Sequence, residues 1–279
     1  MPKHTSIKKS PRKGYWKALF FLAGISPLLG ILALVVIARL GDLPDTDALT
    51  NPRTDLATKV YTMDGKILGS YYNENRSDAR FEDLPQHLID ALISTEDVRF
   101  FSHDGVDFFG LGRAIAFLGK RGGGSTITQQ LAKLLFTEEY ESTSFLERAV
   151  LQKPKEWIIA ARLESHYTKG EIIAMYLNRY DFLNQAVGIR SASTIYFDKE
   201  VEELNVEECA MLVGMLKNSA LFNPLRRIEL VTNRRNVVLN QMGKYEFLTP
   251  TSLDSIKARP ITLNYQRVSH DEGAAPYFR

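Results

Sequence analysis

The apolar positions near the start of the chain form one continuous run rather than a periodic pattern. Residues 18–38 are uncharged and mostly apolar over 21 positions, and six lysine or arginine residues precede them. An apolar helix of this length spans the roughly 30 Å hydrocarbon core of a bilayer. Because positive residues favour the cytoplasmic side, we predict a cytoplasmic basic tail over residues 1–17 and a single transmembrane helix over residues 18–38. A cleaved signal peptide is the weaker alternative, because its apolar region is usually shorter, roughly 7 to 15 residues.

Beyond this run the pattern predicts one mainly α-helical domain over residues 57–249. Residues 39–56 are dotted with Asp, Pro and Thr and predict a linker. Residues 57–71 alternate around an Asp-Gly pair, which predicts a β-hairpin. Apolar positions at helical spacing then predict helices over residues 83–94, 108–118, 144–166, 169–178, 206–217 and 229–247. No strong period follows, so we expect residues 250–279 to be an irregular segment.

Composition and charge narrow the class of partner. The 279 residues are 44% apolar and 10% aromatic, which is ordinary for a packed globular core. The formal net charge is +2, yet the first 41 residues carry seven Lys or Arg and no acid, so the rest is mildly acidic. This balance argues against nucleic acid as a partner. Cys209 is the only cysteine, which excludes an intrachain disulfide, and its apolar surroundings predict burial.

An acidic pair, Glu96-Asp97, begins the first segment with candidate chemistry, which continues to Gly105. An acidic side chain can serve as a general base when its neighbours tune its pKa. A Glu-Asp pair at a helix end is more often solvated, or caps the helix. The pair by itself therefore leaves both interpretations open.

A glycine run, residues 122–124, begins the second such segment, which continues to Lys133. Thr126 and Gln129 have the spacing of a capping box, which predicts a helix start there. Backbone N–H groups and polar side chains then gather at one helix end, a seat for an anionic or hydroxyl-rich ligand. A nucleotide-phosphate loop is set aside, because Arg121 follows Lys120 where that motif requires Ser or Thr.

The two segments in this order, Glu-Asp-x-x-Phe-x-x-His-x-Gly and then Gly-Ser-Thr-Ile-Thr-Gln-Gln-x-x-Lys, resemble the peptidoglycan glycosyltransferases of glycosyltransferase family 51. Members occur alone or as the membrane-proximal module of class A penicillin-binding proteins. The resemblance implies a lysozyme-like helical domain with a small, membrane-facing jaw subdomain. It also implies that the protein sits in the bacterial inner membrane with its catalytic domain outside or in the periplasm. The substrate implied is lipid II, a disaccharide-pentapeptide on undecaprenyl diphosphate, which is polymerised into glycan strands.

The resemblance also implies roles for particular residues. Glu96 matches the general base that deprotonates the acceptor sugar for an inverting transfer, which needs no covalent sugar intermediate. Glu156 matches a second catalytic carboxylate that orients the donor, acts as an acid or helps to hold a divalent cation such as Mg²⁺ or Mn²⁺. The expected substrate-binding residues supply positive charge or hydrogen bonds to sugar and diphosphate: Ser125, Thr126, Gln129, Gln130, Lys133, Arg148 and Lys153. Asp97 and His103 are expected to be structural.

Three positions depart from the family pattern. Gln152 replaces an arginine in the third motif, and Ala174 replaces a glutamate in the fourth. Pro154 is expected to kink the helix predicted over residues 144–166. Two other functions therefore stay open: a lysozyme-like enzyme that cleaves peptidoglycan, and a non-catalytic relative that binds lipid II or other cell-wall synthesis proteins. Residues 274–279 resemble the segment leading into a transpeptidase module, so a bifunctional protein and a monofunctional enzyme both fit.

Overall fold

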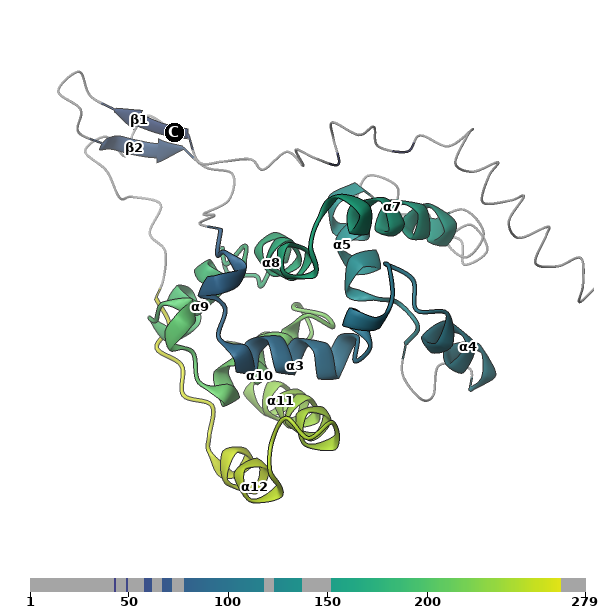
Figure 1. Cartoon of the computed structure of the whole chain (residues 1–279). Coiled ribbons are helices and arrows are strands. Elements are labelled where there is room, and N and C mark those ends of the chain that lie inside the picture. Colours follow the sequence, from purple (N-terminus) through teal and green to yellow (C-terminus); the bar gives the residue numbers. More distant parts are fainter. Residues whose placement is uncertain are drawn as a thin grey trace, which may run out of the picture.

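A computed structural model describes residues 43, 49, 58–61, 67–71, 78–117, 123–136 and 152–266. Within these ranges the chain is mainly α-helical, which confirms the predicted fold class (Figure 1). Within these ranges, no helix has both the length and the apolarity needed to cross a membrane. The predicted transmembrane helix (residues 18–38), the basic tail and most of the linker lie outside the described residues.

Two short strands precede the helices. Strand β1 (Thr58–Tyr61) pairs antiparallel with β2 (Ile67–Tyr71), with an irregularity in the register after Val60. The Asp-Gly pair on which the hairpin was predicted lies between them, outside the described residues. A 3-10 helix, η1 (Phe81–Asp83), then leads into the first long helix.

The core centres on three helices that pack against one another. Helix α3 (Gln86–Glu96) packs on α10 (Val206–Met215) and on α11 (Ile228–Lys244), and α10 also packs on α11. Seven of the ten residues of α10 are buried, including Cys209, as predicted. Burial of apolar side chains is the main favourable term in folding, so these helices form the rigid base on which the end of α3 is held.

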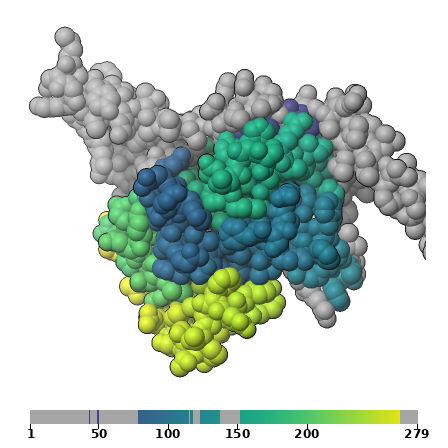
Figure 2. Space-filling model, in the orientation of Figure 1, coloured from purple at the N-terminus to yellow at the C-terminus, as the bar shows by residue number. Residues whose placement is uncertain are grey.

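A second group of helices lies beside the first. Helix α5 (Ile127–Phe136) packs on α7 (Lys153–His166) and on α8 (Lys169–Arg179). In the space-filling view, residues 78–136 form a blue and teal band between the green residues of α7 and α8 and the yellow C-terminal helices (Figure 2). The end of α3 and the start of α5 therefore lie between the two groups.

Helix α4 (Phe108–Ala116) lies at the side of the molecule in Figure 1. Helix α9 (Ile189–Phe197) and two further 3-10 helices, η2 (Phe100–Ser102) and η5 (Val201–Glu203), complete the connections. The phenylalanines at the start of α4 are largely exposed: Phe108 is 72% and Phe109 is 80% accessible. This is an unusual amount of aromatic surface for one short helix.

The expectation that residues 250–279 are irregular is wrong at its start. Helix α12 (Pro250–Ala258) begins there, and it packs on α11 and α10. The Thr249 side chain accepts a hydrogen bond from the backbone N–H of Ser252, and Pro250 stands in the first turn, where its missing N–H costs nothing. The helix is short and has only one buried residue, Ile256, so its apolar period is weak.

Candidate active site

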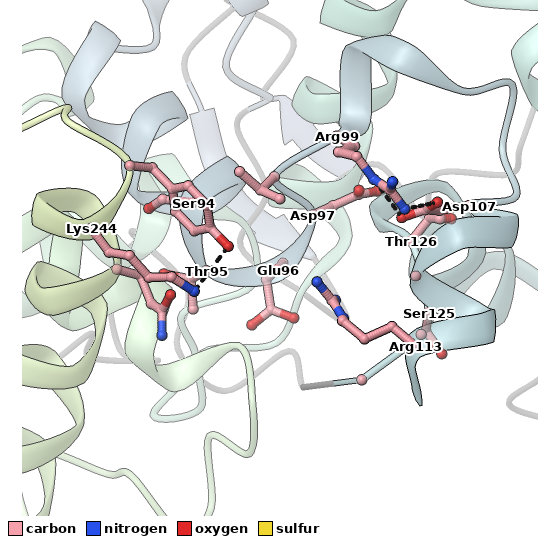
Figure 3. Close-up of a pocket in the computed structure, with 16 residues that line it drawn as sticks. Ser94, Thr95, Glu96, Asp97, Arg99, Asp107, Arg113, Ser125, Thr126 and Lys244 are labelled. Carbon is pink, nitrogen blue, oxygen red and sulfur yellow. Dashed lines mark hydrogen bonds and ion pairs between the residues drawn. The ribbon is translucent and has the colours of Figure 1, made fainter. Parts of the chain in front are cut away.

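Glu96 is the last residue of α3, and its carboxylate faces a cavity of about 500 Å³ (Figure 3). The side chain is 16% exposed, so it is open to a ligand but largely shielded from bulk water. The cavity walls come from the end of α3, from α4, from residues 123–126 and from the end of α11. Four segments far apart in sequence therefore surround one carboxylate.

Both oxygens of the Glu96 carboxylate face a polar group. The side-chain amide of Gln130 donates to Oε2 at 3.0 Å, and Nη2 of Arg234 lies 3.9 Å from Oε1. Burial lowers the pKa of Arg234 and Glu96 raises it, but a guanidinium remains charged at any working pH. Glu96 is thus held by one neutral donor and one cation while keeping an open side toward the cavity.

Other charged groups line the same cavity. Arg113 of α4 and Lys244 of α11 both contribute to its walls, and Figure 3 shows the Arg113 guanidinium pointing into it. Arg99 and Asp107 also line it, but they neutralise each other in an ion pair. Burial raises the pKa of Asp107, yet the hydrogen bonds from Arg99 and the Gly110 backbone, together with nearby positive charge, outweigh this and leave that pKa below its ordinary value. Arg113 and Lys244 make no ion pair with the residues described, so the wall offers two positive groups beside the Glu96 carboxylate, and these can attract an anionic part of a ligand.

Glu156 lies in the first turn of α7 and is buried. Its Oε2 pairs with Lys153 Nζ at 2.6 Å, and the same ammonium donates to Ser125 Oγ at 3.2 Å. Ser125 lines the cavity that Glu96 faces, whereas Glu156 does not. Glu156 therefore reaches the cavity that Glu96 faces only through Lys153 and Ser125, and the two predicted carboxylates do not face each other.

Thr126 and Gln129 form the predicted capping box at the start of α5, which confirms that prediction. The Thr126 hydroxyl accepts a hydrogen bond from the Gln129 backbone N–H at 3.1 Å. The side-chain oxygen Oε1 of Gln129 accepts one from the Thr126 backbone N–H at 3.4 Å. Both side chains are also buried and donate to the carbonyl oxygen of Gly105, at 2.6 and 3.2 Å. These bonds hold the loop that ends at Gly105. Thr126 also lines the cavity that Glu96 faces, and the predicted role of Thr126 and Gln129 in substrate binding stays a prediction.

Asp97 and His103, predicted to be structural, contact each other. His103 Nε2 lies 3.1 Å from both oxygens of the buried Asp97 carboxylate. Asp97 Oδ2 also accepts from the Ile127 N–H at 3.2 Å. Asp97 thus ties the end of α3 to the start of α5, where an unsatisfied N–H and the helix dipole both favour a carboxylate.

The remaining predicted residues are spread more widely. Lys133 is exposed on α5 and makes no hydrogen bond or ion pair with the described residues. Arg148 lies outside the described residues, so its predicted role stays a prediction. Gln152 has a buried Oε1 without a hydrogen-bond partner among the residues described. Pro154 lies in the first turn of α7, a position that tolerates proline. Residues 144–151 of the helix expected to kink there lie outside the described residues, so the kink stays a prediction.

A divalent cation was expected as a possible aid to Glu156. Among the described residues, no three His, Cys, Asp or Glu side chains are grouped so that they could hold a metal ion. Lys153 occupies the position beside Glu156 that a cation would take. The donor set described here does not fit a metal site, and we derive no chemical step through one.

Sequence reasoning missed three cationic side chains near Glu96. Arg113 and Lys244 line the cavity, and Arg234 contacts the Glu96 carboxylate. Arg113 and Lys244 stand in helices whose pattern is ordinary, so no local signal marks them. Arg234 is followed directly by Arg235 in the sequence, but only the packing of α11 on α3 shows that it reaches Glu96.

Comparison with known proteins gives a consistent result. Residues 64–243 match the family model for the transglycosylase domain. Penicillin-binding protein 1A of Vibrio cholerae is 34% identical over 92% of this chain and 30% of its own length. Penicillin-binding protein 1A of Pseudomonas aeruginosa is 37% identical over 84% of this chain and 28% of its own length. The chain thus spans less than a third of the length of these relatives. The crystal structure of Penicillin-Binding Protein 1A from Haemophilus influenzae aligns with a TM-score of 0.44 and 22% identity, over 76% of this chain and 22% of that one.

Proposed function

This chain belongs to the transglycosylase family, and we propose that it polymerises lipid II into glycan strands by inverting transfer, with release of undecaprenyl diphosphate. The observation that carries the proposal is the environment of Glu96. Its carboxylate opens to a cavity whose lining includes residues 123–126, and Ser125 in this segment accepts a hydrogen bond from the Lys153 ammonium. This arrangement supports a base at the cavity and a cation directly behind its wall.

In the proposed reaction Glu96 takes the proton from the 4-hydroxyl of the acceptor sugar. The freed oxygen attacks the anomeric carbon of the growing chain, and the bond from that carbon to the diphosphate oxygen breaks. The electron pair leaves with the diphosphate, and the proton stays on Glu96 until solvent removes it. A single displacement inverts the anomeric centre, which agrees with a site that offers one open carboxylate rather than two facing each other.

The proposed reaction needs cations because its leaving group is an anionic diphosphate. Negative charge grows on its bridging oxygen in the transition state, so fixed positive groups lower the barrier. Lys153 can meet this need from behind Ser125, a residue of the cavity wall, because its ammonium donates to Ser125 Oγ and pairs with Glu156. We assign Lys133, Arg148 and Ser125 to the same binding task, with Gln130 orienting Glu96.

A membrane position for this site is part of the proposal. Phe108 and Phe109 are the most exposed large apolar side chains among the described residues, and Phe101, 61% exposed, is close to them in sequence. Aromatic side chains that protrude from a short helix suit the interface of a bilayer, from which a lipid-linked substrate enters. We therefore assign α4 to the membrane-facing jaw and residues 18–38 to the anchor.

Incubation of the purified full chain with labelled lipid II in detergent tests the proposed function. We expect polymer to form with the wild-type chain, and we expect Glu96→Gln to abolish it, because an amide cannot take the proton. Glu229→Gln is the matched control, since Glu229 is exposed in the first turn of α11 and lies outside the cavity. Fragments released from finished peptidoglycan, without polymer, would instead identify a hydrolase, and binding without turnover would identify a non-catalytic relative.

A further inference from the structure

A buried tyrosine stands behind the candidate base. Tyr176 of α8 is 1% exposed, and its hydroxyl donates to Gln130 Oε1 at 2.8 Å. The other end of the same amide, Nε2, donates to Glu96 Oε2 at 3.0 Å. Three side chains from α8, α5 and α3 thus form one hydrogen-bonded series that ends at the carboxylate.

The direction of the protons in this series is fixed by burial. A Tyr176 hydroxyl in the core must donate its proton somewhere, and the acceptor it has is Gln130 Oε1. Burial also raises the pKa of Tyr176, so the phenol keeps its proton throughout the working range. The amide of Gln130 is then locked with its NH₂ end toward Glu96. Without Tyr176, Gln130 Oε1 loses its donor, and the amide is held in this orientation by Glu96 alone.

We propose that Tyr176 is a positioning residue for the transfer reaction: through Gln130 it holds an N–H donor against the Glu96 carboxylate. The inference rests on the proposed function for its kinetic test, because Tyr176 itself touches neither the cavity nor a substrate. An N–H donor stabilises a carboxylate, whereas a carbonyl oxygen in its place stabilises the protonated acid.

Other charged or titratable groups face Glu96 and stay the same when Tyr176 is changed. Arg234 of α11 lies 3.9 Å away, Arg113 of α4 and Lys244 of α11 line the cavity, and Asp97 is the next residue. Tyr180 lies one turn after Tyr176, just past the end of α8, and its pKa is raised by burial and further by the Glu96 charge. Any change in the pH profile of a Tyr176 variant therefore reports the hydrogen-bonded series and not a changed set of charges.

The test measures lipid II polymerisation against pH for the wild type, Tyr176→Phe and Tyr180→Phe. For Tyr176→Phe we expect the acid limb of kcat/KM to move to higher pH and the rate at pH 6 to fall about tenfold, the effect of losing one hydrogen bond to a charged group. KM should change little, because Tyr176 does not line the cavity. Tyr180→Phe loses a comparable buried bond, to the Met215 carbonyl oxygen at 2.9 Å, and should leave the acid limb in place.

A second arm asks whether Tyr176 acts through Gln130. In a Gln130→Met background, Tyr176→Phe should have no further effect on the acid limb, because the link is already broken. An equal shift in both backgrounds, or an unmoved limb in the single variant, overturns the inference while leaving the proposed function in place. If the wild type makes no polymer, the proposed function fails instead. The series is then judged by carboxyl ¹³C NMR, in which Glu96 must titrate at higher pH in Tyr176→Phe than in the wild type.

Discussion

Replacement of Gly105 by alanine is the sharpest test of how the site is built. Gly105 has a φ of +83°, a conformation that costs other L-residues about 1–2 kcal/mol. An added Cβ would lie 2.9 Å from the Ala160 carbonyl carbon and 3.0 Å from its oxygen, both backbone atoms of α7 that cannot turn aside. The loop must therefore move away from α7.

That movement also disturbs the hydrogen bonds that Gly105 accepts. Its carbonyl oxygen takes the protons of Thr126 Oγ1 and Gln129 Nε2, and each such bond contributes about 1 kcal/mol. Backbone strain and weakened bonds together predict a loss of about 3 kcal/mol in the free energy of unfolding. In a domain of this size each kcal/mol lowers Tm by about 2–4 °C, so Tm should fall by about 6–12 °C.

The assay is thermal unfolding of the full chain in detergent, followed by circular dichroism, with Gly112→Ala as control. Gly112 lies inside α4, and a Cβ there meets no atom within 4 Å. Alanine at that position should be neutral or stabilise the helix by up to about 1 kcal/mol. A Gly105→Ala chain that unfolds within 2 °C of the wild type would refute the claim that this loop is locked against α7.

Three further predictions concern the ion pair of Lys153 with Glu156, the exposed phenylalanines of α4 and the N-terminal cap of α8. Lys153→Met leaves the buried Glu156 carboxylate without its cation, so we expect lipid II turnover to fall at least a hundredfold and the free energy of unfolding to drop by up to about 3 kcal/mol. Lys153→Arg should keep most of the stability. Rate and unfolding measurements on the same variants check both expectations. Phe108→Ser with Phe109→Ser should lower polymerisation in lipid vesicles while leaving Tm within 2 °C, and an equal loss with Phe247→Ser would contradict a specific role for α4. The backbone N–H and the hydroxyl of Thr168 lower the pKa of Glu171, so the stability gained from this cap is present above the unfolded pKa of about 4.3 and disappears as pH falls through the lowered folded value. Glu171→Gln should therefore destabilise the protein at pH 7 and lose that effect at pH 2 in urea unfolding.

Local features of this fold could be predicted from the sequence because their causes are local. The capping boxes of Thr126 with Gln129 and of Thr168 with Glu171 depend only on residues three apart, and both are present. The helices α4 and α10 begin at the predicted residues, since their apolar faces repeat at helical spacing. The weak period of α12 is the exception, because one buried residue gives little signal.

The parts that could not be predicted depend on which helices pack together. Nothing near Thr126 in the sequence shows that its hydroxyl meets Gly105, twenty-one residues earlier in the chain, and is buried there. The same holds for Arg234, which reaches Glu96 only because α11 packs on α3. A motif thus indicates which residues belong to a site, while the tertiary contacts decide which of them hold the site together and which face the ligand.

In the acidic pair at the end of α3, one residue fixes the backbone and its neighbour faces the cavity. Asp97 leaves the helix with a φ of −157° and a ψ of 77°, and its carboxylate is fixed by His103 and by the first N–H of α5. Glu96 is the preceding residue, so the bond that fixes Asp97 also fixes the backbone from which Glu96 extends. Gln130 stands one turn into the helix that Asp97 caps. The donor and the acceptor of the Glu96–Gln130 hydrogen bond are therefore both attached to the junction between α3 and α5, so any change at Asp97 should disturb this bond as well.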